Sequence, residues 1–257
     1  MVERCDVMAV AAHPDDLELG CGGTLARLAA AGKRVGMLDL TRGELSTRGD
    51  VATRRAEAEA AAHALGVAWR ACLDLPDGAI AAEDPQQLAA LVSALRAAAP
   101  RAVLLPHAGD PHPDHGATAE LVRRGVFLAG LARWRPELGK PHRPRLLLAF
   151  PGPRQLWEPD LVVDVTASYA AKRAGLAAHA SQFDPAAGIP THISTGHYLA
   201  AVEGRDRACG NPVDVELGEG FATLGPLPAD EIAWLLDGRG PDPGPRIPDP
   251  RGGGRRA

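Results

Sequence analysis

Short apolar runs alternate with longer amphipathic segments through the first two thirds of the chain. The apolar runs lack the regular polar and apolar alternation of a half-exposed strand, so they are typical of parallel strands buried on both faces. These runs cover residues 7–12, 35–40 and 102–105. The amphipathic segments have helical spacing and cover residues 23–31, 53–65 and 85–98, with a further helix expected from about 115 to 133. The alternation predicts a parallel sheet with helices on both faces.

The last third of the chain continues this pattern less regularly. Two more strands are expected at residues 146–150 and 161–165, a helix at 168–180, and weak helical character at 191–207. We therefore predict an α/β fold with a Rossmann-like, mostly parallel sheet, as a single domain with a smaller C-terminal α/β extension. The expected divisions are a domain at residues 1–228, a short C-terminal segment at 229–237 and a disordered Gly/Pro/Arg-rich tail at 238–257.

Composition and charge narrow the class of protein. The 257 residues carry a formal net charge of −4 and only 4% are aromatic, so nothing indicates a basic or base-stacking surface for nucleic acid. No run approaches the roughly 20 apolar residues of a membrane span. The charged N-terminus is followed by an apolar stretch that is too short for a secretory signal. We expect a cytoplasmic protein that binds neither nucleic acid nor membrane.

The first candidate site follows the first predicted strand. The residues His13, Pro14, Asp15 and Asp16 come where that strand ends, and open α/β sheets bind ligands outside the carboxyl ends of their strands. Pro14 stops the strand and favours a tight turn. In such a turn His13 and Asp16 can face one point while Asp15 projects elsewhere. The two carboxylates can therefore have different roles.

A second polar cluster, PHAGDPHPDHG at residues 106–116, follows another predicted strand. His112 and His115 lie three residues apart at an expected helix start, with Asp114 between them, so both imidazoles can face the same side. A single His-Pro-Asp is a common turn. Two copies, each at the end of a parallel strand, indicate a metal or catalytic site.

The residue types indicate the chemistry of this site. His13, Asp16 and His115 offer two imidazoles and one carboxylate, a set found with catalytic zinc and also with non-haem iron, so the ligands alone do not decide the metal. Asp15 is placed to act as a general base toward water. His112, oriented by Asp114, can serve as an acid or stabilise an oxyanion. These neighbours favour a hydrolase.

The glycines at positions 20, 22 and 23 invite comparison with a dinucleotide-binding loop. The G-x-G-x-x-G pattern would need a glycine at position 25, which is Leu25, and the segment has no Walker lysine. We favour the alternative that these small residues let a helix approach the acidic turn closely.

The motif A-H-P-D-D-x-E-x-G-C-G-G-T-L, followed downstream by H-P-D-H, resembles the LmbE-like/PIG-L zinc-dependent N-acetylglucosaminyl deacetylases. The resemblance covers roughly residues 5–228. Stretches such as LDLTRGELSTRGD, LDLPDGAI and SQF are similar to the bacillithiol-biosynthesis branch, which deacetylates N-acetylglucosaminyl malate. That branch usually has an arginine where this chain has Pro111 and an aromatic residue where it has Leu217.

The resemblance implies roles for individual residues. It implies one zinc ion per subunit held by His13, Asp16 and His115, with Asp15 as general base and His112 and Asp114 as a supporting catalytic pair. It further implies that Arg54 and Tyr198 bind the substrate, where the alternatives are a surface helix charge and ordinary packing. Enzymes of the bacillithiol branch are often hexamers, so the resemblance also implies a homo-oligomer.

Our hypothesis from the sequence is zinc-dependent hydrolysis of the acetamide of an N-acetylglucosamine conjugate, with N-acetylglucosaminyl malate as the expected substrate. The reaction releases acetate and a free amine. The alternatives are deacetylation of another N-acetylglucosaminide, an amidase of a thiol conjugate and, from a different class, a non-catalytic sugar- or nucleotide-binding α/β module. An iron oxygenase would predict a β-rich barrel, which the helical spacing contradicts.

Overall fold

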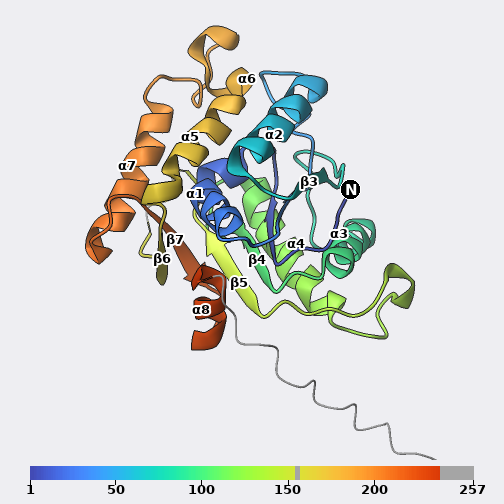
Figure 1. Cartoon of the computed structure of the whole chain (residues 1–257). Helices are drawn as coiled ribbons and strands as arrows, with labels where there is room; N and C mark the ends of the chain where they lie inside the picture. The colour runs from blue at the N-terminus through green and yellow to red at the C-terminus, as the bar shows by residue number, and fades with distance from the viewer. Residues whose placement is uncertain (154–156, 238–257) are drawn as a thin grey trace, which may run out of the picture.

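Within the described residues, 1–153 and 157–237, the computed structural model has a single seven-stranded sheet at its centre (Figure 1). The strands are β1 (Val7–Ala11), β2 (Val35–Asp39), β3 (Trp69–Cys72), β4 (Ala102–Pro106), β5 (Leu146–Phe150), β6 (Leu161–Asp164) and β7 (Gly218–Thr223). Their order is β3-β2-β1-β4-β5-β7-β6. The first five are parallel, and β7 runs antiparallel to both of its neighbours. The predicted tail at 238–257 lies outside the described residues.

Helices cover both faces of the sheet, as the sequence predicts (Figure 1). The first face carries α1 (Asp16–Ala30), α2 (Val51–Leu65) and α5 (Tyr169–Ala178). The second face carries α3 (Pro85–Ala98) and α4 (Pro113–Ala129). The shorter α6 (Ala180–Phe183), with α7 (Tyr198–Gly210) and α8 (Ala229–Asp237), completes the chain. Among these described helices, none combines the length and the apolar character needed to cross a bilayer.

Strand β1 shows why its sequence is continuously apolar. Val7, Ala9 and Ala11 belong to the core between the sheet and the first face, whereas Met8 and Val10 belong to the core on the second face. All five side chains are fully buried. Since successive side chains of a strand point to opposite faces, a central strand with two covered faces has no polar position.

Five of the strands and the main helices confirm the predicted pattern, but β3 and β7 are not anticipated. Strand β3 lies at the edge of the sheet and has the polar residue Arg70 within its four residues. Strand β7, with the sequence GEGFAT, contains two glycines and a glutamate. Both segments become strands through their pairing partners, which local periodicity does not reveal. Strands β7 and β6 continue the same sheet beyond β5.

Helix α1 begins at Asp16, seven residues earlier than expected, and it is kinked at Cys21. The helix expected from the sequence corresponds to the part of α1 that follows the kink. The glycines around the kink allow close packing. A side chain at position 20 would meet the ring of Phe150 at 2.3 Å, and one at position 23 would meet Val165 at 2.8 Å. The glycines thus allow close packing, but against Phe150 of β5 and Val165 after β6 rather than against the acidic turn.

The carboxylate of Glu219 on β7 caps the second half of α1. It accepts hydrogen bonds from the backbone N–H groups of Gly23 (2.9 Å) and Thr24 (2.7 Å), the second and third residues after the kink at Cys21. The fully buried Lys172 of α5 binds the same carboxylate at 2.6 Å and Asp206 of α7 at 2.7 Å. A buried charge network thus joins four elements around the kink.

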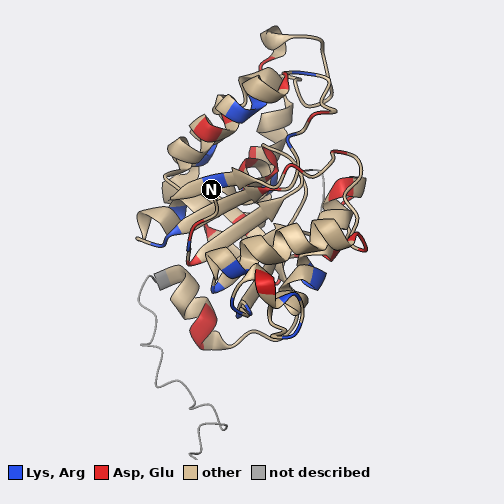
Figure 2. Ribbon diagram, turned by 90° about the vertical axis from the view of Figure 1, so that its right-hand side faces the viewer, with Lys and Arg blue, Asp and Glu red and all other residues tan. Residues whose placement is uncertain are grey.

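In the view of Figure 2, basic and acidic residues are interspersed over the helices, and several acidic segments lie in the loops between the sheet and the helices. This mixture agrees with the near-neutral overall charge.

We predict that Glu219→Gln lowers the free energy of unfolding by about 3 kcal/mol, because removing one member of a buried ionic network leaves its partners uncompensated. Urea denaturation followed by circular dichroism measures the change. The matched control is Glu216→Gln, an exposed partner of Arg207, for which we expect a change within about 0.5 kcal/mol. Equal unfolding midpoints for both variants would contradict the prediction.

Candidate metal and active site

The two predicted polar clusters meet at the point where the strand order of the sheet reverses. Strands β1 and β4 are parallel neighbours, while the chain proceeds from β1 to β2 on one side and from β4 to β5 on the other. Such a switch point leaves a crevice outside the carboxyl ends of the two strands. A cavity of about 710 Å³ lies there, and all eight site residues predicted from the sequence line it. These are His13, Asp15, Asp16, Arg54, His112, Asp114, His115 and Tyr198.

The carboxylate of Asp16 joins the two clusters. Its Oδ2 lies 3.3 Å from Nδ1 of His13 and accepts a hydrogen bond from the His13 backbone N–H at 2.8 Å. Its Oδ1 lies 3.1 Å from Nε2 of His115. The three residues predicted as metal ligands are therefore in contact with one another, across the two loops.

Two more carboxylates approach His13, Asp77 from the turn after β3 and Asp114 from the first turn of α4. The carboxylate of Asp114 therefore contacts His13, whereas the sequence paired it with His112, to which Asp114 donates only its backbone N–H. Nε2 of His13 lies 3.1 Å from Asp77 Oδ1 and 3.2 Å from Asp114 Oδ2. Burial lowers the pKa of this imidazole, but its hydrogen bonds to Asp114, Asp16 and Asp77 outweigh burial and raise the pKa to about 12. The local potential is therefore strongly negative and stabilises positive charge at this point.

His115 has a further carboxylate partner, Asp110, whose Oδ2 lies 3.0 Å from the imidazole Nδ1. Burial lowers the pKa of His115, but the charges and hydrogen bonds of Asp16 and Asp110 outweigh it and raise this pKa to about 10. A carboxylate on the outer nitrogen of an imidazole is the usual support of a metal-binding histidine, because it fixes the ring and increases its basicity.

The sequence interpretation did not select Asp77 or Asp110. A signal for Asp110 was available, because it lies inside the PHAGDPHPDHG cluster. Asp77 belongs to the turn after β3, where Gly78 has a positive φ of 72°, and only the fold brings this turn to His13. A Pro-Asp-Gly turn on its own indicates no more than a change of chain direction.

His112 has a tautomer that follows from its place at the start of α4. It is the N-cap residue of that helix, and its Nδ1 accepts a hydrogen bond from the backbone N–H of Asp114 at 3.2 Å. Burial and the positive charges of His115 and His13 lower the pKa of His112. In the neutral ring the proton therefore resides on Nε2, which makes this nitrogen a hydrogen-bond donor toward the cavity.

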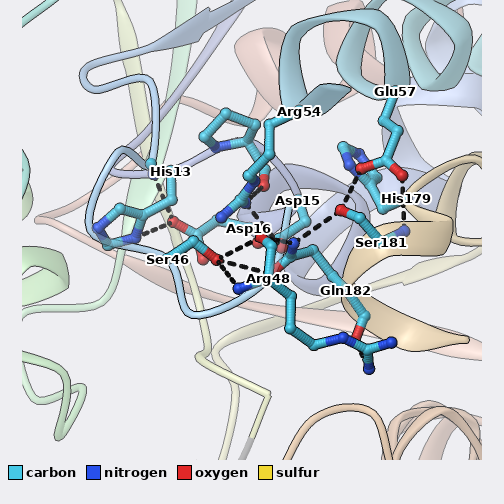
Figure 3. Close-up of polar contacts among 12 residues, drawn as sticks. His13, Asp15, Asp16, Ser46, Arg48, Arg54, Glu57, His179, Ser181 and Gln182 are labelled. Atoms are coloured by element: carbon cyan, nitrogen blue, oxygen red, sulfur yellow. Dashed lines mark hydrogen bonds and ion pairs between the residues drawn. The ribbon is translucent and has the colours of Figure 1, made fainter. Parts of the chain in front are cut away.

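Asp15 differs from its neighbour Asp16 in both backbone and environment. Its φ of 117° lies in the region that non-glycine residues rarely adopt, so the turn holds it under strain. Its Oδ2 accepts a hydrogen bond from Nη2 of Arg54 at 3.1 Å (Figure 3). Burial raises the pKa of Asp15 to about 6, against the lowering effect of Arg54. In Asp16, the charge and hydrogen bond of His115 outweigh burial and hold the pKa well below its usual range.

Arg54 is not a surface charge. It is 4% exposed, and its guanidinium contacts both Asp15 and the backbone carbonyl of Pro14. Gly43 makes room for it, because a side chain at this position would meet Nη1 of Arg54 at 2.8 Å. The arginine thus connects α2 to the turn that carries Asp15.

Tyr198 is 6% exposed and stacks on Phe183 of α6 with ring centroids 6.1 Å apart. Helix α6 also contacts the loop before α2, because Ser46 of that loop donates a hydrogen bond to Oε1 of Gln182 at 3.0 Å (Figure 3). Segments from the first and the last third of the chain thus form one wall of the cavity.

The donor set fits a divalent cation. Two groups of described side chains have ligand atoms close enough to hold one ion, namely His13 with His112 and His115, and His13 with Asp77 and Asp114. Neither group is the predicted set of His13, Asp16 and His115, although Asp16 contacts both of these imidazoles. Mixed imidazole and carboxylate donors suit a metal of zinc's type. The excess of carboxylates supplies the negative potential that a divalent ion requires.

Comparison with known proteins places the chain in a family. Residues 8–126 match the profile of the family described as GlcNAc-PI de-N-acetylase (PIG-L). The chain is 30% identical to the 1D-myo-inositol 2-acetamido-2-deoxy-alpha-D-glucopyranoside deacetylase of Streptomyces avermitilis, over 84% of the chain and 97% of that protein. It is 31% identical to the diacetylchitobiose deacetylase of Thermococcus kodakarensis, over 69% and 70%. The structure matches the conserved protein TT1542 of Thermus thermophilus with a TM-score of 0.79 and 37% identity, over 87% and 96%.

The relatives from Streptomyces and Thermococcus are deacetylases, and the chain is accordingly an enzyme of the class that hydrolyses amide bonds. More specifically, this chain belongs to the PIG-L, or LmbE-like, deacetylase family.

We predict that Asp110→Asn weakens zinc binding by about 10- to 100-fold, because the outer nitrogen of His115 loses its charged partner. Competition with a chromophoric chelator at fixed pH measures the affinity. The asparagine keeps the oxygen that accepts the His112 backbone N–H, so the local turn is preserved. The control, Asp214→Asn, changes an exposed carboxylate at a left-handed position that asparagine tolerates. Equal affinities in the two variants would contradict the role of Asp110.

Proposed function

We propose that this protein uses zinc to hydrolyse the acetamide of an N-acetylglucosamine conjugate, releasing acetate and the free amine. The observation that carries the proposal is the contrast between two adjacent aspartates in one cavity. Asp16 contacts the imidazoles of His13 and His115, whereas Asp15 lines the same cavity without contacting either imidazole at hydrogen-bond distance. A carboxylate that is not needed for binding is what a hydrolase requires as a base.

The residues that would hold the ion are His13, Asp16 and His115, which are already in contact through Asp16. A bound zinc ion supplies Lewis acidity, which polarises a carbonyl oxygen and lowers the pKa of water. The chain contributes the orientation of these ligands, since Asp110 fixes the ring of His115 and Asp77 and Asp114 approach that of His13.

Asp15 acts as the general base in this proposal. Its carboxylate takes a proton from the water that attacks the acetyl carbonyl, and Arg54 holds the carboxylate in place while it does so. Burial keeps its pKa above that of an ordinary aspartate, which makes the carboxylate a better proton acceptor. The strained turn fixes the direction in which the base points.

His112 acts on the other side of the reacting carbonyl. Its Nε2–H donates a hydrogen bond to the oxyanion of the tetrahedral intermediate, which is usually the largest contribution to such catalysis. Tyr198 lines the same cavity and contacts the substrate. The departing nitrogen receives its proton from Asp15 or from His112.

The conjugate itself follows from the relatives only in part. The relatives named above are deacetylases of an inositol glycoside and of diacetylchitobiose. N-acetylglucosaminyl malate, the substrate expected from the bacillithiol branch, stays a prediction. The cytoplasmic location and the assembly into a homo-oligomer such as a hexamer also stay predictions.

We predict that Asp15→Asn lowers kcat by about 10²- to 10⁴-fold, because the proton acceptor is lost while the ligands of the ion are unchanged. Asparagine is chosen because it tolerates a positive φ better than alanine. The measurement combines acetate release with zinc content per subunit. A variant with full zinc and near-normal turnover would exclude Asp15 as the base.

Removal of the metal provides an independent test. Dialysis against a chelator should abolish acetate release from an N-acetylglucosaminide, and one equivalent of Zn²⁺ per subunit should restore it. Metal analysis before and after dialysis verifies the state of the protein. Turnover that persists in metal-free protein would contradict the zinc assignment.

A further inference from the structure

The turn that carries Asp15 has a backbone that its surroundings must fix. Asp15 is the N-cap residue of α1, and its φ of 117° persists only where neighbouring contacts determine the conformation. Arg54 of α2 contributes one such contact, because its guanidinium lies 3.1 Å from the carboxylate of Asp15. The later turns of α1 and α2 show what else holds this segment in place.

The start of α6 joins α1 to α2 beside this turn. One helical turn after Asp15, Oε1 of Glu18 lies 3.2 Å from Nε2 of His179, the N-cap residue of α6. Two residues further on, Ser181 donates hydrogen bonds from its backbone N–H and its hydroxyl to the two carboxylate oxygens of Glu57 in α2, both at 2.6 Å (Figure 3). The first residues of α6 are therefore bound to both helices.

These contacts close a ring through three helices. In order, the ring consists of Asp15, Glu18, His179, Ser181, Glu57 and Arg54. Arg54 holds the turn of Asp15 directly from α2, and α6 holds the next turns of α1 and α2. Because the ring is closed, the turn cannot rotate unless more than one contact breaks, which is how a strained backbone is kept in place.

His179 is the second cation of a buried charged cluster. Both His179 and Glu18 are fully buried, and neither ring nitrogen of His179 has a hydrogen bond of good geometry within the described part of the chain. Glu18 and Asp39 share the guanidinium of Arg70, at 2.5 and 2.6 Å. Since a buried carboxylate needs a positive partner, an imidazolium at position 179 balances the second carboxylate.

The charge of His179 also acts on the base. Burial lowers the pKa of this imidazole, but the carboxylates of Glu18 and Asp15 outweigh burial and raise it. Burial raises the pKa of Asp15, whereas Arg54 and His179 both lower it. Two cations that come from different parts of the chain therefore favour the ionised carboxylate that a base requires.

We propose that His179 is a positioning residue for deacetylation, which holds the turn of Asp15 in its reactive orientation through Glu18. The inference rests on the proposed function, in which Asp15 is the base. Among the described residues that line the cavity, Gln182 comes from α6 and His179 is absent. His179 therefore acts through its neighbours and does not contact the substrate.

The test measures whether His179 acts through Asp15. His179→Gln keeps a polar side chain that can donate to Glu18, but it removes the ring and its charge. In zinc-loaded protein we expect kcat for an N-acetylglucosaminide to fall about tenfold while KM changes less than about twofold, with zinc content unchanged. In the Asp15→Asn background the same substitution should lower kcat less than about twofold, because a positioning residue has no effect once the group that it positions is lost.

Two further variants separate positioning from stability. Ser181→Ala removes one hydrogen bond to Glu57 without a change of charge, so it should lower kcat about threefold, again only where Asp15 is present. Asp39→Asn breaks a buried ion pair of Arg70 that lies outside the ring. It should lower the urea midpoint of unfolding while kcat of the folded protein stays within about twofold.

The outcomes separate the inference from the proposed function. If Asp15→Asn turns over normally, the base assignment fails and the inference fails with it. If Asp15→Asn is impaired and His179→Gln loses no kcat, or loses the same factor in both backgrounds, the inference is wrong and the deacetylase assignment stands.

An equal loss of kcat in Asp39→Asn would also overturn the inference, because any break in the buried cluster would then have the same effect. Circular dichroism and zinc content verify that each variant is folded and loaded. If His179→Gln does not fold, the comparison of Ser181→Ala in the two backgrounds decides, and an equal loss in both contradicts the ring's role in positioning Asp15.

Discussion

The contact of one carboxylate with two imidazoles is the interaction on which the rest of the site depends. Asp16 follows β1, and His115 follows β4, so their contact is possible only because these two strands are parallel neighbours. The parallel sheet places both loops at the same edge, and the reversal of strand order there leaves room between them. The same contact brings Asp15 and His112, the residues beside these ligands, to one cavity. The pairing of β1 with β4 therefore brings the two polar segments together, and the side chains after these strands form the site.

The two adjacent aspartates illustrate how local surroundings divide the work. Both are buried, but Asp16 has imidazole partners that favour its charged form, whereas Asp15 has a single guanidinium and a pKa near 6. Such a separation of pKa values between neighbouring groups is typical of acid–base sites. The carboxylates around the two imidazoles make the site attractive to a cation.

Much of the fold and the site could be predicted from the sequence, because the signals are local. The strand at residues 7–11 is apolar at every position, and the two His-Pro-Asp turns are read directly from the chain. The failures concern residues whose role depends on distant partners. Arg70 makes the sequence of β3 look polar, although its guanidinium is buried and forms ion pairs with Asp39 (2.6 Å) and Glu18 (2.5 Å). Asp77 reaches His13 from 64 positions away, and the tautomer of His112 depends on a helix cap.

The cap of α1 has a consequence for how the protein acquires its activity. Helix α1 starts with the ligand Asp16, and its second half is capped by a carboxylate of β7, nearly 200 residues later in the chain. During synthesis the first turn of the site emerges early, but its helix obtains this support only after the last strand has left the ribosome. Strand β7 also enters between β5 and β6, so it is inserted into a sheet whose neighbours already exist. A truncated chain that retains both metal-binding motifs therefore lacks the support of the helix that carries the first of them.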